Sequence, residues 1–287
     1  MANSAAVRKP KSGKSWLMTF ILILLAFTVL FPLYMTIIIA FKNPSEMTND
    51  IAGALSFPAS WNFSNFIEAI RVTDFFRTIG NSFLITALTL IVTIVLHSIA
   101  AFAVGRNKEH KKFYNFLYLY FISGMFVPFS MLMLPLVKEV SILGLDNKIG
   151  LILLYAVFYF PMNLLLYTGY LKNIPIALEE AAYVDGANTW TTFWKICFPL
   201  LRPMHATVAV VTALGVWNDV MTPLVMLSGG DGSDTTLPLA QLLFQTKFGT
   251  NYNLAFASYL LAMIPILLFY LFAQKQIING VVNGAVK

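Results

Sequence analysis

The sequence predicts an all-α integral membrane protein with six transmembrane helices. Hydrophobic residues make up 58% of the chain and charged residues only 11%, whereas soluble domains carry about 25% charged residues. Six long apolar segments are separated by polar ones, and lysine and arginine gather in alternate polar segments. Composition and this alternation together exclude an ordinary soluble domain.

Each apolar segment is long enough to cross a membrane as a helix, which takes roughly 20 residues. Five of them contain no Asp, Glu, Lys or Arg: residues 15–41, 78–105, 113–137, 149–171 and 248–274. The remaining segment, residues 203–230, contains only Asp219. Membrane strands are about 10 residues long with alternating polarity, so helices are expected. The first segment is too long for a secretory signal and is expected to stay uncleaved.

The distribution of basic residues predicts the topology. With the N-terminus in the cytoplasm, the inside segments hold 13 of the 19 Lys and Arg residues, and the outside segments hold the other six with eight acids. Both termini and residues 173–202 are then cytoplasmic. The expected organisation is an N-terminal tail (1–14), a six-helix domain (15–274) and a C-terminal tail (275–287). These lysines flank spans, so they do not indicate nucleic-acid binding.

Two outside segments carry further signals. Asn65, Phe66, Ala69 and Ile70 have the spacing of a short amphipathic helix at the membrane interface, either an aromatic anchor or a surface for a partner. Residues 228–247 are rich in Gly, Asp, Ser and Thr and are expected to form a flexible hairpin. Prolines within the spans, such as Pro128, predict kinks.

A polar segment between the fourth and fifth spans has the pattern of a short helix, a glycine and a second helix. Pro175 suits the first turn of a helix, and Gly186 allows the chain to turn. The helix between them contains Glu180, Ala181 and Ala182. We interpret this loop, residues 173–202, as a docking element for a soluble partner. The alternative is a solvated amphipathic helix lying on the membrane.

Intramembrane polar residues are few. Asp219, which follows Trp217 and Asn218, lies just past the middle of the fifth expected span, where a carboxylate costs up to about 3 kcal/mol. It either caps backbone groups freed by Pro223 or lines a polar path or gate. His97 in the second span is expected to be a packed hydrogen-bonding residue, because a proton relay would need a chain of titratable groups.

Signals of catalysis are lacking in the sequence. It has no GxxxxGK[ST], HExxH or Gly-x-Ser-x-Gly pattern, and it contains only three histidines and the single cysteine Cys197. No catalytic residue, metal ligand or cofactor site is therefore expected. Three function classes remain: a transport subunit that needs a partner, a self-sufficient secondary carrier or channel for a small polar solute, and a membrane-embedded enzyme. The third lacks a plausible constellation of side chains.

Three motifs in order resemble one family. The stretch from Glu180 to Gly186, followed by Ile-Cys-Phe-Pro, resembles the EAA signature of the membrane subunits of bacterial ABC importers. Trp-Asn-Asp at 217–219 and the ending Gly-x-x-x-Gly-Ala-Val-Lys are similar to the carbohydrate branch, the family of maltose-transporter inner-membrane subunits. The resemblance covers essentially the whole chain, with a general similarity to multiple-sugar and raffinose-type subunits. Phe198 departs from the leucine of the family pattern, which affects only the fine shape of the loop.

The resemblance implies a type I ABC importer transmembrane domain in the bacterial inner membrane. It implies a second, usually non-identical permease subunit, two ATPase subunits that bind ATP and Mg, and an extracytoplasmic sugar-binding protein. The cargo would be a di- or oligosaccharide, which this chain passes without catalysing a reaction. The ATPase-coupling residues would be Glu179, Glu180, Ala181, Ala182, Asp185 and Gly186. The pathway or gate candidates are Trp217, Asn218 and Asp219.

Overall fold

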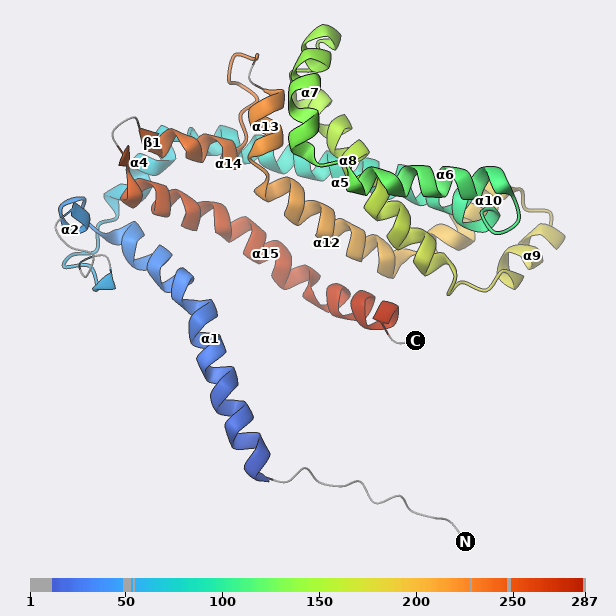
Figure 1. The fold of residues 1–287 in the computed structure, drawn as a ribbon, viewed down its shortest axis with the longest axis horizontal. Helices are drawn as coiled ribbons and strands as arrows, with labels where there is room; N and C mark the ends of the chain where they lie inside the picture. The colour runs from blue at the N-terminus through green and yellow to red at the C-terminus, as the bar shows by residue number, and fades with distance from the viewer. Residues whose placement is uncertain (1–11, 49–52, 54, 228, 247–248, 286–287) are drawn as a thin grey trace. The chain divides into compact units, whose positions relative to one another are not determined.

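The computed structural model describes residues 12–48, 53, 55–227, 229–246 and 249–285. The chain forms two compact units, Met1–Arg71 with Phe244–Leu261 and Val72–Leu243 with Ala262–Lys287. Strand structure in the described residues is limited to β1 (Gln245–Thr246) paired antiparallel with β2 (Gly249–Thr250). The predicted all-α class is therefore confirmed (Figure 1).

Four helices are long and apolar enough to cross a membrane: α1 (Ser12–Phe41), α5 (Phe75–Asn107), α8 (Lys148–Leu171) and α15 (Tyr252–Ala285). They correspond to the first, second, fourth and sixth expected spans. Helix α15 continues beyond residue 274 to Ala285, so the expected C-terminal tail is helical over the part that the structure describes. Two bent helix pairs supply the other spans, for up to six in total.

The third expected span, residues 113–137, is not one continuous helix. It comprises α6 (Lys112–Ser123), the 3₁₀ turn η1 (Gly124–Phe126) and α7 (Phe129–Leu143), and α6 and α7 meet at 99°. Val127 is extended, with ψ 109°. The ring of Pro128 disfavours helical angles at the preceding residue, which ends η1. The expected kink is therefore a full break in the helix.

The fifth expected span, residues 203–230, is also interrupted. Helix α12 (Arg202–Asn218) ends at Asp219, whose backbone is extended with ψ 130°, and α13 (Met221–Met226) follows. The sequence had suggested that Asp219 lies inside a continuous helix. In the structure it lies in a break between two helices. At its other end α12 meets the helical segment Thr189–Leu200, which belongs to the loop at 173–202, at an angle of 72°. This bend separates the loop from the span.

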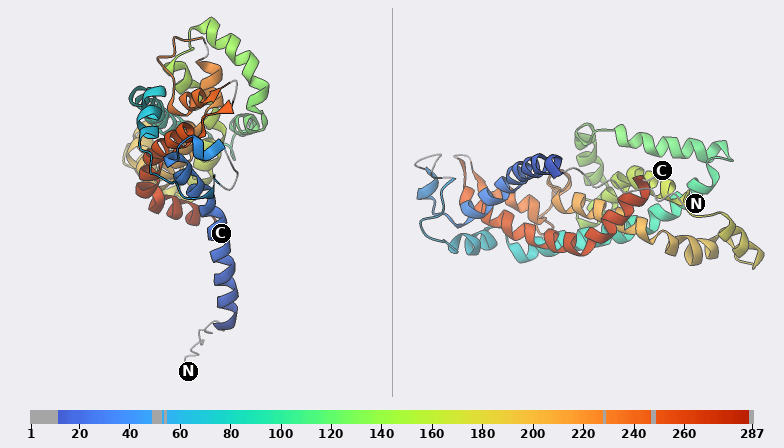
Figure 2. Two further views of the ribbon diagram at one scale, coloured as in Figure 1. Left: turned by 90° about the vertical axis from the view of Figure 1, so that its left-hand side faces the viewer. Right: turned by 90° about the horizontal axis from the view of Figure 1, so that it is seen from below.

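The core of the second unit lies between α5, α8 and α12. Helices α5 and α8 run side by side in the views of Figures 1 and 2 and make the most extensive helix–helix contact. Buried apolar side chains such as Tyr167, Leu171 and Val208 fill the space between the three helices. Asn163 of α8 donates to His97 Nδ1 of α5 at 3.0 Å and to Thr212 Oγ1 of α12 at 3.3 Å. The expected packed role of His97 is thus confirmed.

The first unit contains the predicted amphipathic helix. It is α4 (Ser64–Val72), whose buried residues are Asn65 and Ala69. Asn65 Nδ2 donates to the carbonyls of Ala40 and Lys42, at 2.9 and 2.8 Å, which ties α4 to the end of α1. The short helix α2 (Ser45–Thr48) lies between them in sequence.

The expected flexible hairpin at 228–247 contains regular structure and is held in place by hydrogen bonds. It includes α14 (Leu237–Ala240) and the 3₁₀ turn η3 (Gln241–Phe244). Asn81 Nδ2 of α5 donates to the carbonyls of Ser233 and Thr235, at 2.8 and 2.9 Å. Asp234 accepts from the backbone N–H of Lys148 at 3.0 Å and pairs with its ammonium at 3.1 Å. Residues 228, 247 and 248 lie outside the described residues.

Candidate functional site

The loop at 173–202 contains the expected helix–glycine–helix. Its first helix, α9 (Ala177–Val184), begins after Pro175 and ends at Gly186, whose φ is 85°. The N–H of Gly186 donates to the carbonyl of Tyr183, and the N–H of Ala187 donates to that of Ala182. These two bonds form a Schellman motif, in which glycine supplies the left-handed residue that ends the helix. The local sequence therefore dictates both ends of α9.

The second half of the loop returns toward α12 through a continuous helical path. Asn188 caps α10 (Thr189–Thr192) by accepting from the N–H of Thr191 at 2.8 Å. A π-helical turn, η2 (Phe193–Cys197), and the short α11 (Phe198–Leu200) follow. In Figure 1 and the right-hand view of Figure 2, α9 lies beyond the ends of α5 and α8, where the packed core of the unit does not cover it.

Four of the six predicted coupling residues line one concave surface between the halves of the loop. Ala181, Ala182, Asp185 and Gly186 face Lys195 and its neighbours around a cavity of about 640 Å³. Small side chains at these positions leave room for a side chain of another molecule to enter. Glu180 is exposed on the same helix but does not line this cavity. The structure thus brings four of the six residues together on one accessible surface.

Exposed apolar side chains on α9 were missed by the sequence interpretation. Val184, with 88% of its side chain exposed, and Tyr183 lie at the end of the helix, and Trp190 is exposed on α10. Large apolar groups gathered on the surface of a polar loop are typical of sites that contact another protein. The signal was present in the sequence, because these residues stand among the charged and small residues of the loop.

Glu179 points inward and pairs with Arg106 at the end of α5. The guanidinium donates through Nε to Glu179 Oε1 at 2.7 Å, and its Nη2 lies 2.5 Å from the same oxygen. Both side chains are only 15% exposed. Arg106 also donates to the carbonyls of Leu171 and Ile174, at 3.0 and 3.1 Å, at the end of α8. One guanidinium therefore joins α5, α8 and α9, so Glu179 holds the loop in place and is not a free contact.

Cys197 lies against the same ion pair. Its thiol donates to Glu179 Oε1 at 3.4 Å and is fully buried. Burial, reinforced by the neighbouring carboxylate, raises the pKa of the thiol to about 12. Because the thiolate is the reactive form of cysteine, this thiol is inert at neutral pH. Cys197 therefore has the setting of a structural thiol.

Asp219 acts as a helix cap. Its Oδ1 accepts from the N–H groups of Met221 and Thr222, at 2.9 and 3.3 Å, which satisfies donors at the start of α13. Its Oδ2 accepts from the hydroxyl of buried Tyr155 at 3.0 Å. The capping role expected for Asp219 is therefore confirmed, and the gate remains a prediction.

The other two pathway candidates have separate surroundings. Trp217 is buried, whereas the exposed Asn218 donates to the carbonyl of Leu214 in its own helix at 2.8 Å. All three residues lie at the opposite end of α12 from the loop, roughly 25 Å away at 1.5 Å per helical residue. Among the described residues no group of three His, Cys, Asp or Glu side chains is placed to hold a metal ion.

Known proteins are similar to this chain in sequence. Residues 94–282 match the family described as binding-protein-dependent transport system inner membrane component. The chain is 40% identical to the multiple sugar-binding transport system permease protein MsmG of Streptococcus mutans, over 90% of this chain and 92% of that protein. It is 32% identical to the melibiose/raffinose/stachyose import permease protein MelC of Bacillus subtilis, over 83% and 86%.

A solved structure has a similar fold. It is the crystal structure of a bacterial ABC transporter involved in the import of the acidic polysaccharide alginate, with a TM-score of 0.79 and 20% identity over 94% of this chain and 99% of that one. The matched family region covers the loop at 173–202, Asp219 and most of the helical core. The chain belongs to the family of inner-membrane components of binding-protein-dependent transport systems.

Proposed function

We propose that this chain is the permease subunit of an ABC importer that moves a di- or oligosaccharide into the cytoplasm of a bacterium. The surface of α9 carries the proposal: an exposed helix end, a cavity lined by small residues, and an ion pair that ties the helix to the spans. The sugar class is supported by the names of relatives, which transport multiple sugars or melibiose, raffinose and stachyose.

The partners follow from what the chain lacks. Its sequence has no ATP-binding loop of the GxxxxGK[ST] type, so ATP and Mg would be bound by two ATPase subunits that contact α9 from the cytoplasm. A second permease subunit would complete the pathway, and an extracytoplasmic sugar-binding protein would deliver the cargo. Both termini would then be cytoplasmic, as the distribution of Lys and Arg indicates.

The contacts of Arg106 with Glu179 and with the carbonyls at the end of α8 provide a route for coupling between α9 and the spans. A displacement of α9 by the ATPase would act on Arg106 through Glu179, and from there on the ends of α5 and α8. Because these two helices are the most extensively packed pair, they would move together. The proposed role of Arg106 is to position the loop, and Glu180, Ala181, Ala182, Asp185 and Gly186 would meet the ATPase directly.

Sugar uptake into vesicles that contain the complete transporter tests this function. Glu180→Lys reverses the charge of the exposed contact, and we expect uptake to fall at least tenfold while the complex stays folded. Glu68→Lys, an equally exposed charge reversal on α4, is the matched control. Uptake that continues unchanged when the ATPase subunits are omitted would instead show a self-sufficient carrier or channel.

A further inference from the structure

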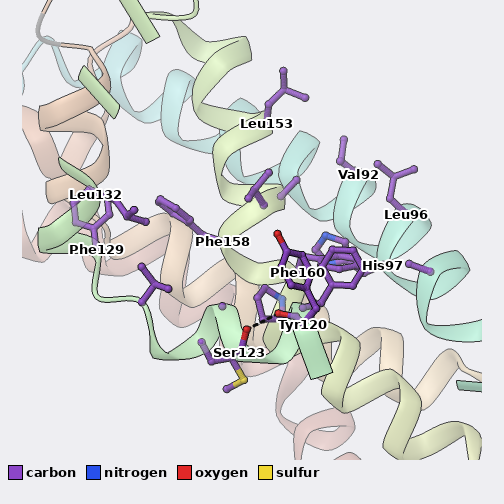
Figure 3. A pocket seen from close by; sticks show the side chains of 18 residues that line it. Val92, Leu96, His97, Tyr120, Ser123, Phe129, Leu132, Leu153, Phe158 and Phe160 are labelled. Carbon is purple, nitrogen blue, oxygen red and sulfur yellow. Dashed lines mark hydrogen bonds between the residues drawn. The ribbon is translucent and has the colours of Figure 1, made fainter. Parts of the chain in front are cut away.

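The bend between α6 and α7 lies beside an apolar cavity of about 1110 Å³. Figure 3 shows Val92, Leu96 and His97 of α5 at one side and Phe129 and Leu132 of α7 at the other, with side chains of α8 between them. The lining is mostly apolar, and two of its polar side chains are already engaged. His97 Nδ1 bonds with Asn163, and Ser123 Oγ donates to a carbonyl of its own helix. The cavity therefore suits an apolar occupant.

A strip of exposed aromatic rings leads from this cavity along α6. Phe113, Phe116 and Tyr120 follow the i, i+3, i+7 spacing of one helix face, and they are 65, 63 and 62% exposed. The rings of Phe116 and Tyr120 stack with centroids 6.1 Å apart, and Tyr120 also lines the cavity. The strip thus runs from the start of α6 to the cavity.

The start of the strip is strongly basic. Lys108, Lys111 and Lys112 lie within five residues, and the single acid among them, Glu109, pairs with Lys172 at 3.3 Å. In the part of the chain that the structure describes, none of these three lysines forms an ion pair with a carboxylate. The ammonium of Lys108 lies 3.7 Å from the ring centre of Tyr118. The positive charge of this turn is left to pair with an anion from outside.

We propose that the α5–α6 hairpin binds one anionic phospholipid. Its headgroup phosphate pairs with Lys111 and Lys112, and one acyl chain follows the aromatic strip into the cavity. The dimensions agree: eight residues from Lys112 to Tyr120 span about 12 Å of helix, and one leaflet of the hydrocarbon core is about 15 Å thick. The positive-inside rule explains the lysines without a lipid, but it requires neither the strip nor the cavity.

Photolabelling of the complete transporter in nanodiscs tests this site and does not depend on transport. The probe is a phosphatidylglycerol that carries a diazirine at the end of one acyl chain, present in trace amounts in phosphatidylcholine. We expect labelled peptides from residues 92–100, 120–132 and 153–161, with the label competed by unlabelled phosphatidylglycerol. Equal labelling by the matching phosphatidylcholine probe would overturn the proposal.

Two variants test the headgroup contact and the acyl-chain contact separately. Lys111→Gln with Lys112→Gln should lower labelling at least tenfold, because each lysine near an anionic headgroup contributes roughly fivefold, whereas Lys138→Gln on α7 should not. Val157→Trp fills the cavity from an exposed position and should abolish labelling there, whereas Ile149→Trp on the same helix should not. Undiminished labelling in both variants, or crosslinks showing that another subunit covers the cavity, would contradict a lipid site.

Discussion

Arg106 and Glu179 lie 73 residues apart in the sequence, yet the guanidinium of one donates to the carboxylate of the other at 2.7 Å. Through the same guanidinium the carbonyl of Leu171, the last residue of α8, and that of Ile174, just beyond α8, are tied to α5. The ion pair is therefore the place where the exposed loop helix α9 is connected to the packed helices of the unit. Its removal should affect coupling more than it affects sugar binding.

Arg106→Met should lower the stability of the protein by about 3 kcal/mol, because it leaves a largely buried carboxylate without its partner. Glu179→Leu alone should cost a similar amount, and the double variant should cost less than the sum. Thermal unfolding of the three variants measures this coupling energy. Strictly additive effects would mean that the two side chains do not depend on each other.

Cys197 should resist alkylation at pH 8. With a pKa of about 12, roughly one thiol in 10⁴ is ionised at that pH, and the rate should rise as the pH increases toward 12. Thr189→Cys, made in a Cys197→Ser chain, places an exposed thiol in the same loop and should react at least 100-fold faster with a maleimide. Equal rates for the two thiols at pH 8 would contradict the buried setting.

The variant Asp219→Asn distinguishes a role of Asp219 as a helix cap from a role of its negative charge in a gate. Asparagine keeps an acceptor oxygen for the N–H of Met221, and its amide N–H can donate to the hydroxyl oxygen of Tyr155 in place of the bond that the carboxylate accepted, so the variant should retain stability and most of its uptake. Asp219→Ala removes the cap, which costs about 1 kcal/mol, and removes the acceptor for the O–H of the buried Tyr155 at a further cost of roughly 1–3 kcal/mol. If the asparagine variant is stable but transports no sugar, the negative charge itself is required and the gate interpretation gains support.

Asp234→Ala should release the outer loop from the start of α8. The ion pair with Lys148 is partly exposed, so the loss of stability should be only about 0.5 kcal/mol. The Lys148 amide, which donates to Asp234, should exchange hydrogen faster. Asp231→Ala is the control, because Asp231 accepts a hydrogen bond within its own turn, from the N–H of Ser233. Unchanged exchange over residues 145–150 would show that the contact does not hold the loop.

The features that the sequence predicted are those set by neighbouring residues. Long apolar runs predicted α1, α5, α8 and α15, because burial of one continuous segment in lipid needs no knowledge of its partners. The ends of α9 were predicted from Pro175 and Gly186 for the same reason. The chemistry of a turn or a helix end is contained in a few consecutive residues.

The features that were missed depend on distant contacts or on competing local effects. The partner of Glu179 could not be identified because Arg106 belongs to another helix, and the family resemblance placed Glu179 among the residues that contact the ATPase. The break at Asp219 was hidden by the high hydropathy around it, although the carboxylate could satisfy the N–H groups of a new helix start. Pro128 signalled a kink, but the 99° angle accompanies separate contacts of the two helices, α6 with α8 and α7 with α13.

A crosslink from α9 to the ATPase would show whether α9 is the helix that couples this chain to ATP hydrolysis. Val184, 88% exposed at the end of α9, is replaced by p-benzoylphenylalanine in the complete transporter, and the complex is irradiated. We expect the crosslinked product to contain an ATPase subunit, and the same replacement at exposed Lys138 of α7 to give no such product. A Val184 product that contains only lipid or only the second permease subunit would contradict the assignment of α9 as the coupling site.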